Sequence, residues 1–117
     1  MTVVLCLPWP PSVNGYWRAH KGRQILSAKA REYQAACRAA LMQQRAAGMH
    51  LSGSLVVGIA LFPPDKRRRD IDNSIKALLD QLVRNSVIVD DSMIDRLVVQ
   101  RFEVRRFGEA ELTVGTL

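Results

Sequence analysis

Residues 54–91 read SLVVGIALFPPDKRRRDIDNSIKALLDQLVRNSVIVDD, and this stretch sets the framework of the fold. Its first nine residues are apolar on both alternating faces, which is typical of a central strand covered on both sides. A proline pair ends that strand. From Ile71 onward, apolar residues recur at helical spacing until Asn85, which predicts an amphipathic helix. A short apolar run then leads into an acidic pair.

The chain on either side of this stretch adds one more helix and several strands. Ser27 is a favoured N-cap and Gly48 a favoured C-cap, which predicts one helix of roughly 30 Å between them. The other expected strands cover residues 2–7, 23–26, 94–105 and 110–116. The order β-β-α-β-α-β-β predicts a mixed α/β (α+β) fold: one domain over residues 1–117, with one mixed sheet and two helices on one face.

The charge balance points to a polyanionic partner. Lysine and arginine total 17 against 11 acidic residues, a formal charge of +6, which favours nucleic acid. No apolar run approaches the roughly 20 residues of a spanning helix, so we expect no membrane association. Cys6 and Cys37 lack the spacing of a zinc or redox motif, which favours buried free thiols in a cytoplasmic protein.

Two aspartates one residue apart, Asp70 and Asp72, open the predicted second helix. Residues i and i+2 point the same way only in an extended segment, so a shared metal ion requires an extended Asp70 and places Asp72 near the helix start. Lys76 follows Asp72 by four residues, a spacing that also fits an ordinary helix ion pair. Asp91 follows the short apolar run, which could place it at a strand end beside the helix start.

Carboxylates that converge at one helix start need a counter-charge. Two of them about 4 Å apart repel by about 4 kcal/mol at an effective dielectric near 20. Mg²⁺ prefers such oxygen ligands, and the cations of residues 66–69 would attract phosphate to the same place. These residues indicate metal-dependent phosphodiester hydrolysis. The candidate catalytic residues are Asp70, Asp72, Lys76 and Asp91, and the candidate metal ligands are Asp70, Asp72 and Asp91.

A second stretch, PWPPSVNGYWRAHKGR at residues 8–23, interleaves aromatic side chains with cations. Such a pattern can stack bases and hold phosphates. It is equally compatible with Trp9 and Trp17 packing the loop onto the core. The residues expected to contact nucleic acid are Lys66, Arg67, Arg68, Arg69, Trp17, Arg18, Lys21 and Arg23.

Three segments in this order, LPWPPSVNGYWR (7–18), RRRDIDN-x-x-K (67–76) and VDD (89–91), resemble the motifs of the RusA family of Holliday-junction resolvases, small nucleases of phages and prophages. The resemblance implies a homodimer that binds four-way DNA junctions and makes paired, symmetric nicks with Mg²⁺ or Mn²⁺ and no organic cofactor. It implies metal-binding catalytic roles for Asp70, Asp72 and Asp91, an essential cation at Lys76, and a weaker candidate at Asp90.

One departure from the family pattern follows the second helix. Relatives often have a glycine there, where this chain has Asn85 and Ser86. Asparagine tolerates the left-handed conformation, so we expect Asn85 to preserve the turn.

Two other classes of protein are compatible with parts of this pattern. In a non-catalytic nucleic-acid-binding module, the acids would only cap the helix and offset nearby arginines. That alternative stays open. A metal site for nucleotide-sugar transfer is excluded on size, because 117 residues leave no room for a nucleotide-binding domain and an acceptor site.

Overall fold

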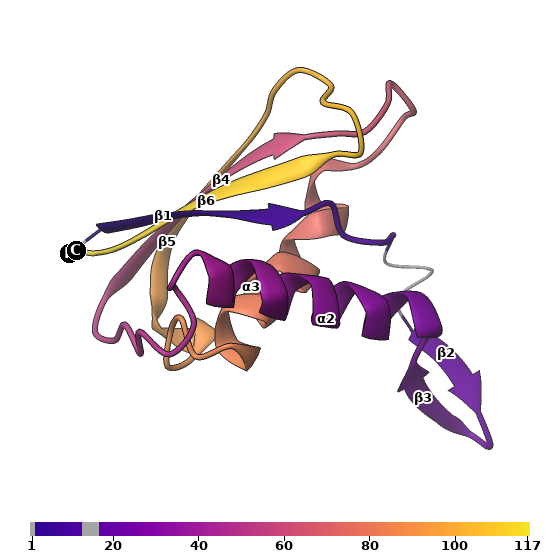
Figure 1. The fold of residues 1–117 in the computed structure, drawn as a ribbon, viewed down its shortest axis with the longest axis horizontal. Helices are drawn as coiled ribbons and strands as arrows, with labels where there is room; N and C mark the ends of the chain where they lie inside the picture. Colours follow the sequence, from indigo (N-terminus) through magenta and orange to yellow (C-terminus); the bar gives the residue numbers. More distant parts are fainter. Residues whose placement is uncertain (1, 13–16) are drawn as a thin grey trace.

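The computed structural model describes residues 2–12 and 17–117, and its centre is a four-stranded sheet (Figure 1). The strands β1 (Thr2–Pro8), β4 (Leu55–Phe62), β5 (Ile94–Arg101) and β6 (Glu109–Thr116) lie in the order β1-β6-β4-β5. β6 is antiparallel to both β1 and β4, whereas β4 and β5 are parallel. The prediction of one mixed sheet is confirmed.

Two helices, α2 (Ala28–Gln43) and α3 (Ile75–Arg84), cover one face of this sheet, as the sequence predicted (Figure 1). α3 supplies the crossover that the parallel pair β4 and β5 requires. Alternate residues of β4 face the helices and are at most 3% exposed, namely Leu55, Val57, Ile59 and Leu61. They pack with the apolar stripes of both helices into one core.

The other face of the sheet is open, so the prediction that β4 is covered on both sides is wrong. Gly58 and Ala60 of β4 are only half-buried there, and Val4 and Val98 on the outer strands are 69% and 55% exposed. The strand register places Val4, Thr113, Gly58 and Val98 in one row across the four strands. The helices therefore bury only one of the two apolar faces of β4.

The first helix is shorter than predicted. Ser27 is the N-cap as expected, because its hydroxyl accepts a hydrogen bond from the Ala30 amide at 3.1 Å. The helix ends at Gln43 with Gln44 as its C-cap, not at Gly48, since Arg45 has a φ of +60° that α-helix cannot continue. The Gln44 side chain turns back to β1, where its amide accepts from the backbone nitrogen of Cys6 and donates to the oxygen of the same residue, both at 2.8 Å.

The second helix begins with a 3-10 turn, η1 (Ile71–Ser74), before α3. Ile71 is 41% exposed and does not extend the buried stripe as predicted. α3 ends at Asn85 as expected, but Asn85 is not the left-handed residue, since its φ is −98°. Ser86, with a φ of +55°, makes the turn instead.

A hairpin, β2 (Trp17–His20) and β3 (Arg23–Leu26), projects beyond the N-terminal end of α2 (Figure 1). The predicted strand at 23–26 is confirmed, whereas the sequence treated residues 17–20 as loop. Lys21 and Gly22 form the expected turn with φ of +50° and +75°. β5 ends at Arg101, short of the predicted Arg105. No helix in the described ranges is long and apolar enough to cross a membrane.

Candidate active site

Asp70 and Asp72 have the backbone geometry that a shared ligand requires. Asp70 is extended, with φ −75° and ψ 138°, and Asp72 lies in the first turn of η1. Asp70 occupies the N-cap position, yet its side chain makes no capping hydrogen bond to the described residues. Both side chains are exposed, and neither forms an ion pair within 4.0 Å among the residues the structure describes. Their oxygens are therefore accessible to a ligand.

Lys76 connects Asp91 to the start of α3. Its Nζ lies 3.4 Å from Asp91 Oδ2 and 3.1 Å from Asp80 Oδ1. The hydrogen bond and charge of Asp80, and then those of Asp91, raise the pKa of Lys76 above its usual value. The expectation that Asp91 lies beside this helix is therefore supported by a direct contact. Asp80 was missed by the sequence reasoning, although its i+4 spacing from Lys76 was the available signal.

Asp90 has a local structural task that separates it from Asp91. It caps the 3-10 turn η2 (Asp91–Met93) by accepting hydrogen bonds from the amide and hydroxyl of Ser92. These bonds hold the pKa of the Asp90 carboxyl below its usual range. Because Asp90 is engaged in this cap, the Asp91 carboxylate is the one of the pair directed at Lys76.

Arg69 is held within the protein more firmly than the other cations of its cluster. Its guanidinium pairs with Asp65 at 2.7 Å and lies over the Trp9 ring, 5.8 Å from the centroid. The Arg69 carbonyl in turn accepts a 2.6 Å hydrogen bond from the side chain of Arg101 on β5. These contacts fix the backbone directly before Asp70. Trp9 also packs against the core, so its packing role is observed.

The neighbouring cations Lys66, Arg67 and Arg68 are exposed. A depression of about 300 Å³ lies beside them, between the segment around Pro11 and the start of η1, and it reaches Asn73. Arginine side chains at its rim and an accessible helix start nearby provide a surface that a phosphate group would fit.

The hairpin carries the remaining expected nucleic-acid contacts. The backbones of Trp17, Arg18, Lys21 and Arg23 lie in β2, β3 and their turn, and the Lys21 side chain is exposed at the tip. The side chains of Trp17, Arg18 and Arg23, and all of Tyr16, lie outside the described parts of the structure.

The three aspartates offer only oxygen ligands, which are the ligands that Mg²⁺ and Mn²⁺ prefer. Their ligand atoms do not all lie within 4.8 Å of one another, so the side chains would have to move to share one ion. Among the described residues, the group that meets this distance is Cys6, Glu109 and Glu111. Arg105 already neutralises its carboxylates, at 3.3 Å and 3.1 Å, which makes this group an ion-pair cluster of the sheet edge.

The fold and these side chains define a small α/β protein with accessible carboxylates bordered by cations at one helix start. Residues 8–114 match the family model described as Endodeoxyribonuclease RusA. The chain is 34% identical over 113 residues to the crossover junction endodeoxyribonuclease RusA of Escherichia coli K12 and to that of Enterobacteria phage 82, covering 97% of this chain and 93% of each relative. The protein of that name from Escherichia coli O139:H28 is 33% identical over 116 residues, 99% of this chain and 96% of the relative. The chain belongs to the RusA family.

Proposed function

We propose that this protein is a structure-selective endodeoxyribonuclease that resolves four-way DNA junctions in the cytoplasm by paired, symmetric, metal-dependent phosphodiester hydrolysis. The observation that carries the proposal is the pair of accessible carboxylates, Asp70 and Asp72, which have no ion-pair partner among the described residues and precede a lysine that contacts Asp91. Membership of a family whose relatives are named crossover junction endodeoxyribonucleases supports the reaction and the substrate.

Asp70, Asp72 and Asp91 would hold Mg²⁺, with Mn²⁺ as an alternative. When bound, the ion would supply Lewis acidity at the phosphate and lower the pKa of water. Asp70 and Asp72 are exposed and Asp91 is partly exposed, and two of the three lie at the start of η1, so that their side chains can reorient towards an ion. Repulsion between the carboxylates makes cation binding favourable.

Lys76 would act on the substrate phosphate. Its ammonium is at the surface, with 74% of the side chain exposed, and Asp80 and then Asp91 raise the pKa of Lys76 further above neutral pH. A positive charge there would stabilise the charge that develops on the phosphate oxygens. Asp80 would position the lysine, since it contacts Nζ more closely than Asp91 does.

The exposed cations would bind the DNA backbone. Lys66, Arg67 and Arg68 extend from the loop that enters η1, and Lys21 extends from the hairpin tip. Arg69 would contribute mainly by fixing this loop, because Asp65 and Trp9 already engage its guanidinium. Trp17, Arg18 and Arg23 remain proposed contacts from the hairpin.

We propose that the active form is a homodimer, because symmetric nicks in two strands need two copies of one small site. The open sheet face supports this, since its exposed Val4 and Val98 are covered by no element among the described residues. An exposed apolar surface of this kind is typical of a protein interface. Sedimentation equilibrium tests the assignment, and a monomer at the concentrations that give paired nicks would contradict it.

The test of the reaction is a nicking assay on a four-way junction with Mg²⁺. Asp70→Asn and Asp91→Asn should each lower the nicking rate more than about a hundredfold, since even the partners that only orient metal ligands contribute about 10- to 100-fold. Junction binding should persist or tighten as a negative charge is lost. Glu32→Gln, an exposed site on α2 with the same charge change, should nick normally.

The result that contradicts the reaction is a wild-type protein that binds junctions and makes no nicks with either metal ion. The non-catalytic binding module would then be the better assignment. Two acids already have the structural roles that this alternative assigns to them, since Asp65 pairs with Arg69 and Asp90 caps η2.

A further inference from the structure

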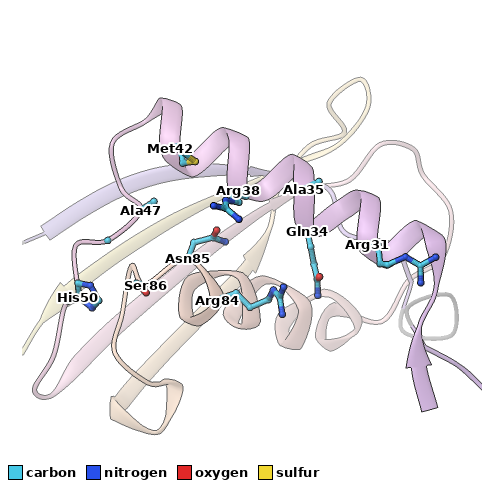
Figure 2. A pocket seen from close by; sticks show the side chains of 11 residues that line it. Arg31, Gln34, Ala35, Arg38, Met42, Ala47, His50, Arg84, Asn85 and Ser86 are labelled. Atoms are coloured by element: carbon cyan, nitrogen blue, oxygen red, sulfur yellow. The ribbon is translucent and has the colours of Figure 1, made fainter. Parts of the chain in front are cut away.

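A second basic feature, which we name the α2–α3 groove, lies between the two helices on the side of the molecule away from the open sheet face (Figure 2). Its volume is about 740 Å³. In Figure 2, Gln34 and Arg38 lie on the side of α2 that faces α3, and Asn85 points back from the end of α3. Arg31 lies at the N-terminal end of α2, where it donates to the Leu26 carbonyl. The groove is lined by Arg31, Gln34, Ala35, Arg38, Met42, Ala47, Gly48, His50, Arg84, Asn85 and Ser86.

Basic side chains line the α2–α3 groove, and no acidic side chain of the described residues does so. The basic residues are three arginines and His50. None of Arg31, Arg38 and Arg84 has an acidic partner within 4.0 Å among the described residues, in contrast to Arg69 with its 2.7 Å pair. Gathering like charges in one concave surface is unfavourable unless an anion is bound there.

The polar groups of the groove suit an anion with several oxygens. Each guanidinium offers up to five N–H donors, whereas the Asn85 side chain already donates to the Gln81 carbonyl at 2.9 Å. One guanidinium is oriented already, since Arg31 donates to the Leu26 carbonyl at 2.8 Å. Small residues such as Ala35 and Gly48 leave the space between the arginines open. A phosphate group fits this combination of charge, donors and room.

Two loops, residues 48–51 and 85–87, form the far end of the groove and are joined by backbone hydrogen bonds. The amide of Gly48 donates to the Asn85 carbonyl at 2.9 Å, and the amide of His50 donates to the Ser86 carbonyl at 2.8 Å. The next bond, from Leu51 to Val87 at 2.9 Å, anchors both loops in the core. The backbone at this end of the groove is therefore fixed in the free protein, so that little backbone ordering opposes ligand binding.

The groove and the candidate active site share the helix α3. Lys76, Asp80 and Arg84 follow one another at i+4 spacing along α3, so Arg84 lies about 12 Å along the helix axis from Lys76 and about 80° around it. Twelve ångströms corresponds to between three and four base pairs of duplex at about 3.4 Å each. One duplex arm could therefore contact both places.

We propose that the α2–α3 groove binds backbone phosphates of a junction arm. The separation of about 12 Å places these phosphates about three to four base pairs from the point of cleavage. This inference rests on the proposed function for its substrate. Its role is binding and orientation of the arm, with no part in the chemistry at Asp70, Asp72 and Asp91. It predicts contacts that are independent of DNA sequence, because only the backbone is bound.

The test is the double variant Arg38→Gln/Arg84→Gln, with junction binding measured over a range of salt concentrations in Ca²⁺, without turnover. Two lost phosphate contacts should weaken binding about tenfold or more and flatten the slope of log K against log salt by about 1.8. The matched control is Lys29→Gln/Arg45→Gln, which removes two exposed α2-side charges outside the groove. It should change the slope by less than half as much.

Separate readouts distinguish this proposal from the proposed function. At saturating protein with Mg²⁺, the groove variant should still nick the junctions that it binds, whereas Asp70→Asn should bind and fail to nick. If wild-type protein binds DNA but makes no nicks, the proposed nuclease activity is wrong. The salt dependence of DNA binding by the groove and control variants still tests whether the groove binds phosphates.

Two results would overturn the groove. One is an equal loss of affinity and slope in the groove and control variants, which would mean that only total charge matters. The other is binding of inorganic phosphate that Arg38→Gln/Arg84→Gln abolishes while that variant leaves the affinity for DNA and its salt slope unchanged, which would assign the groove to a small free anion.

Discussion

Replacing Gly108 with alanine tests whether the turn before β6 and the loop before Asp70 form one packed unit. Gly108 has a φ of +74°, a conformation that costs an L residue about 1–2 kcal/mol. A Cβ added there would lie 2.6 Å from Trp9 Cβ, 2.8 Å from Trp9 Cγ and 3.0 Å from Pro64 Cδ. Overpacking of this kind costs a further 1–3 kcal/mol or so. We expect Gly108→Ala to lower the free energy of unfolding by about 2–5 kcal/mol.

The assay is equilibrium urea unfolding followed by tryptophan fluorescence. Gly53→Ala is the matched control, because Gly53 also has a positive φ, +94°, but a Cβ there would meet nothing within 4 Å. The control should show the backbone penalty alone. A stability loss for Gly108→Ala within about 0.5 kcal/mol of the control, which is the scatter of neutral surface substitutions, would refute the reasoning.

Gly108→Ala should also affect the candidate active site. Trp9 is the residue that the new methyl group displaces, and the Arg69 guanidinium lies over its ring. A shift of Trp9 would loosen the loop before Asp70. Nicking by the folded variant at low temperature should therefore fall, whereas Gly53→Ala should leave it unchanged.

Three further predictions concern a lysine, a glutamine and the thiols. Asp80→Asn should lower the pKa of Lys76, since Asp80 is the largest cause of its elevation, so the alkaline limb of the nicking profile should move to lower pH. The ion pair that Lys76 makes is fully formed below its unfolded pKa and is lost as pH rises through the higher folded value. Gln44→Ala should cost about 1–2 kcal/mol of unfolding free energy, because it removes side-chain hydrogen bonds to both backbone groups of Cys6. Burial raises the pKa of Cys6 and of Cys37 to about 11, so at pH 8 both thiols should react with Ellman's reagent about a hundredfold more slowly than a thiol of ordinary pKa.

Each of these predictions has its own control. An unchanged alkaline limb in Asp80→Asn would show that Lys76 does not titrate in the reaction. Gln43→Ala, on the exposed neighbour of Gln44, should be nearly neutral in the same unfolding assay, and equal losses would contradict the role assigned to the Cys6 contacts. Denaturant should restore fast reaction of both thiols, and fast reaction in the native state would contradict the raised pKa of the half-buried Cys6 and the buried Cys37.

The local elements were predictable from the sequence because each depends on neighbours along the chain. The Ser27 cap, the helix that ends at Asn85, the extended Asp70 and the turn at Gly22 follow from side-chain size, spacing and permitted φ. Local rules failed where a distant contact decided the outcome. α2 ends early, where Gln44 binds β1 across 38 residues of sequence.

The candidate site divides in the same way. Residue types and spacing singled out the aspartates and Lys76, and the family resemblance assigned them roles. Sequence spacing did not show that Asp65 engages Arg69, that Asp80 holds Lys76, or that the arginines of the α2–α3 groove lack acidic partners among the described residues. These differences depend on which side chains meet after folding.

By itself the sequence determined the class of the fold, the family, and the stretch that carries the chemistry, because periodic burial and short motifs are properties of neighbouring residues. Only the tertiary structure decided that β6 lies between β1 and β4, that one face of β4 stays open, and which cations remain unpaired. The physical reason is that strand order and ion pairing depend on contacts between distant segments, such as the one that joins Arg101 to Arg69 across 32 residues.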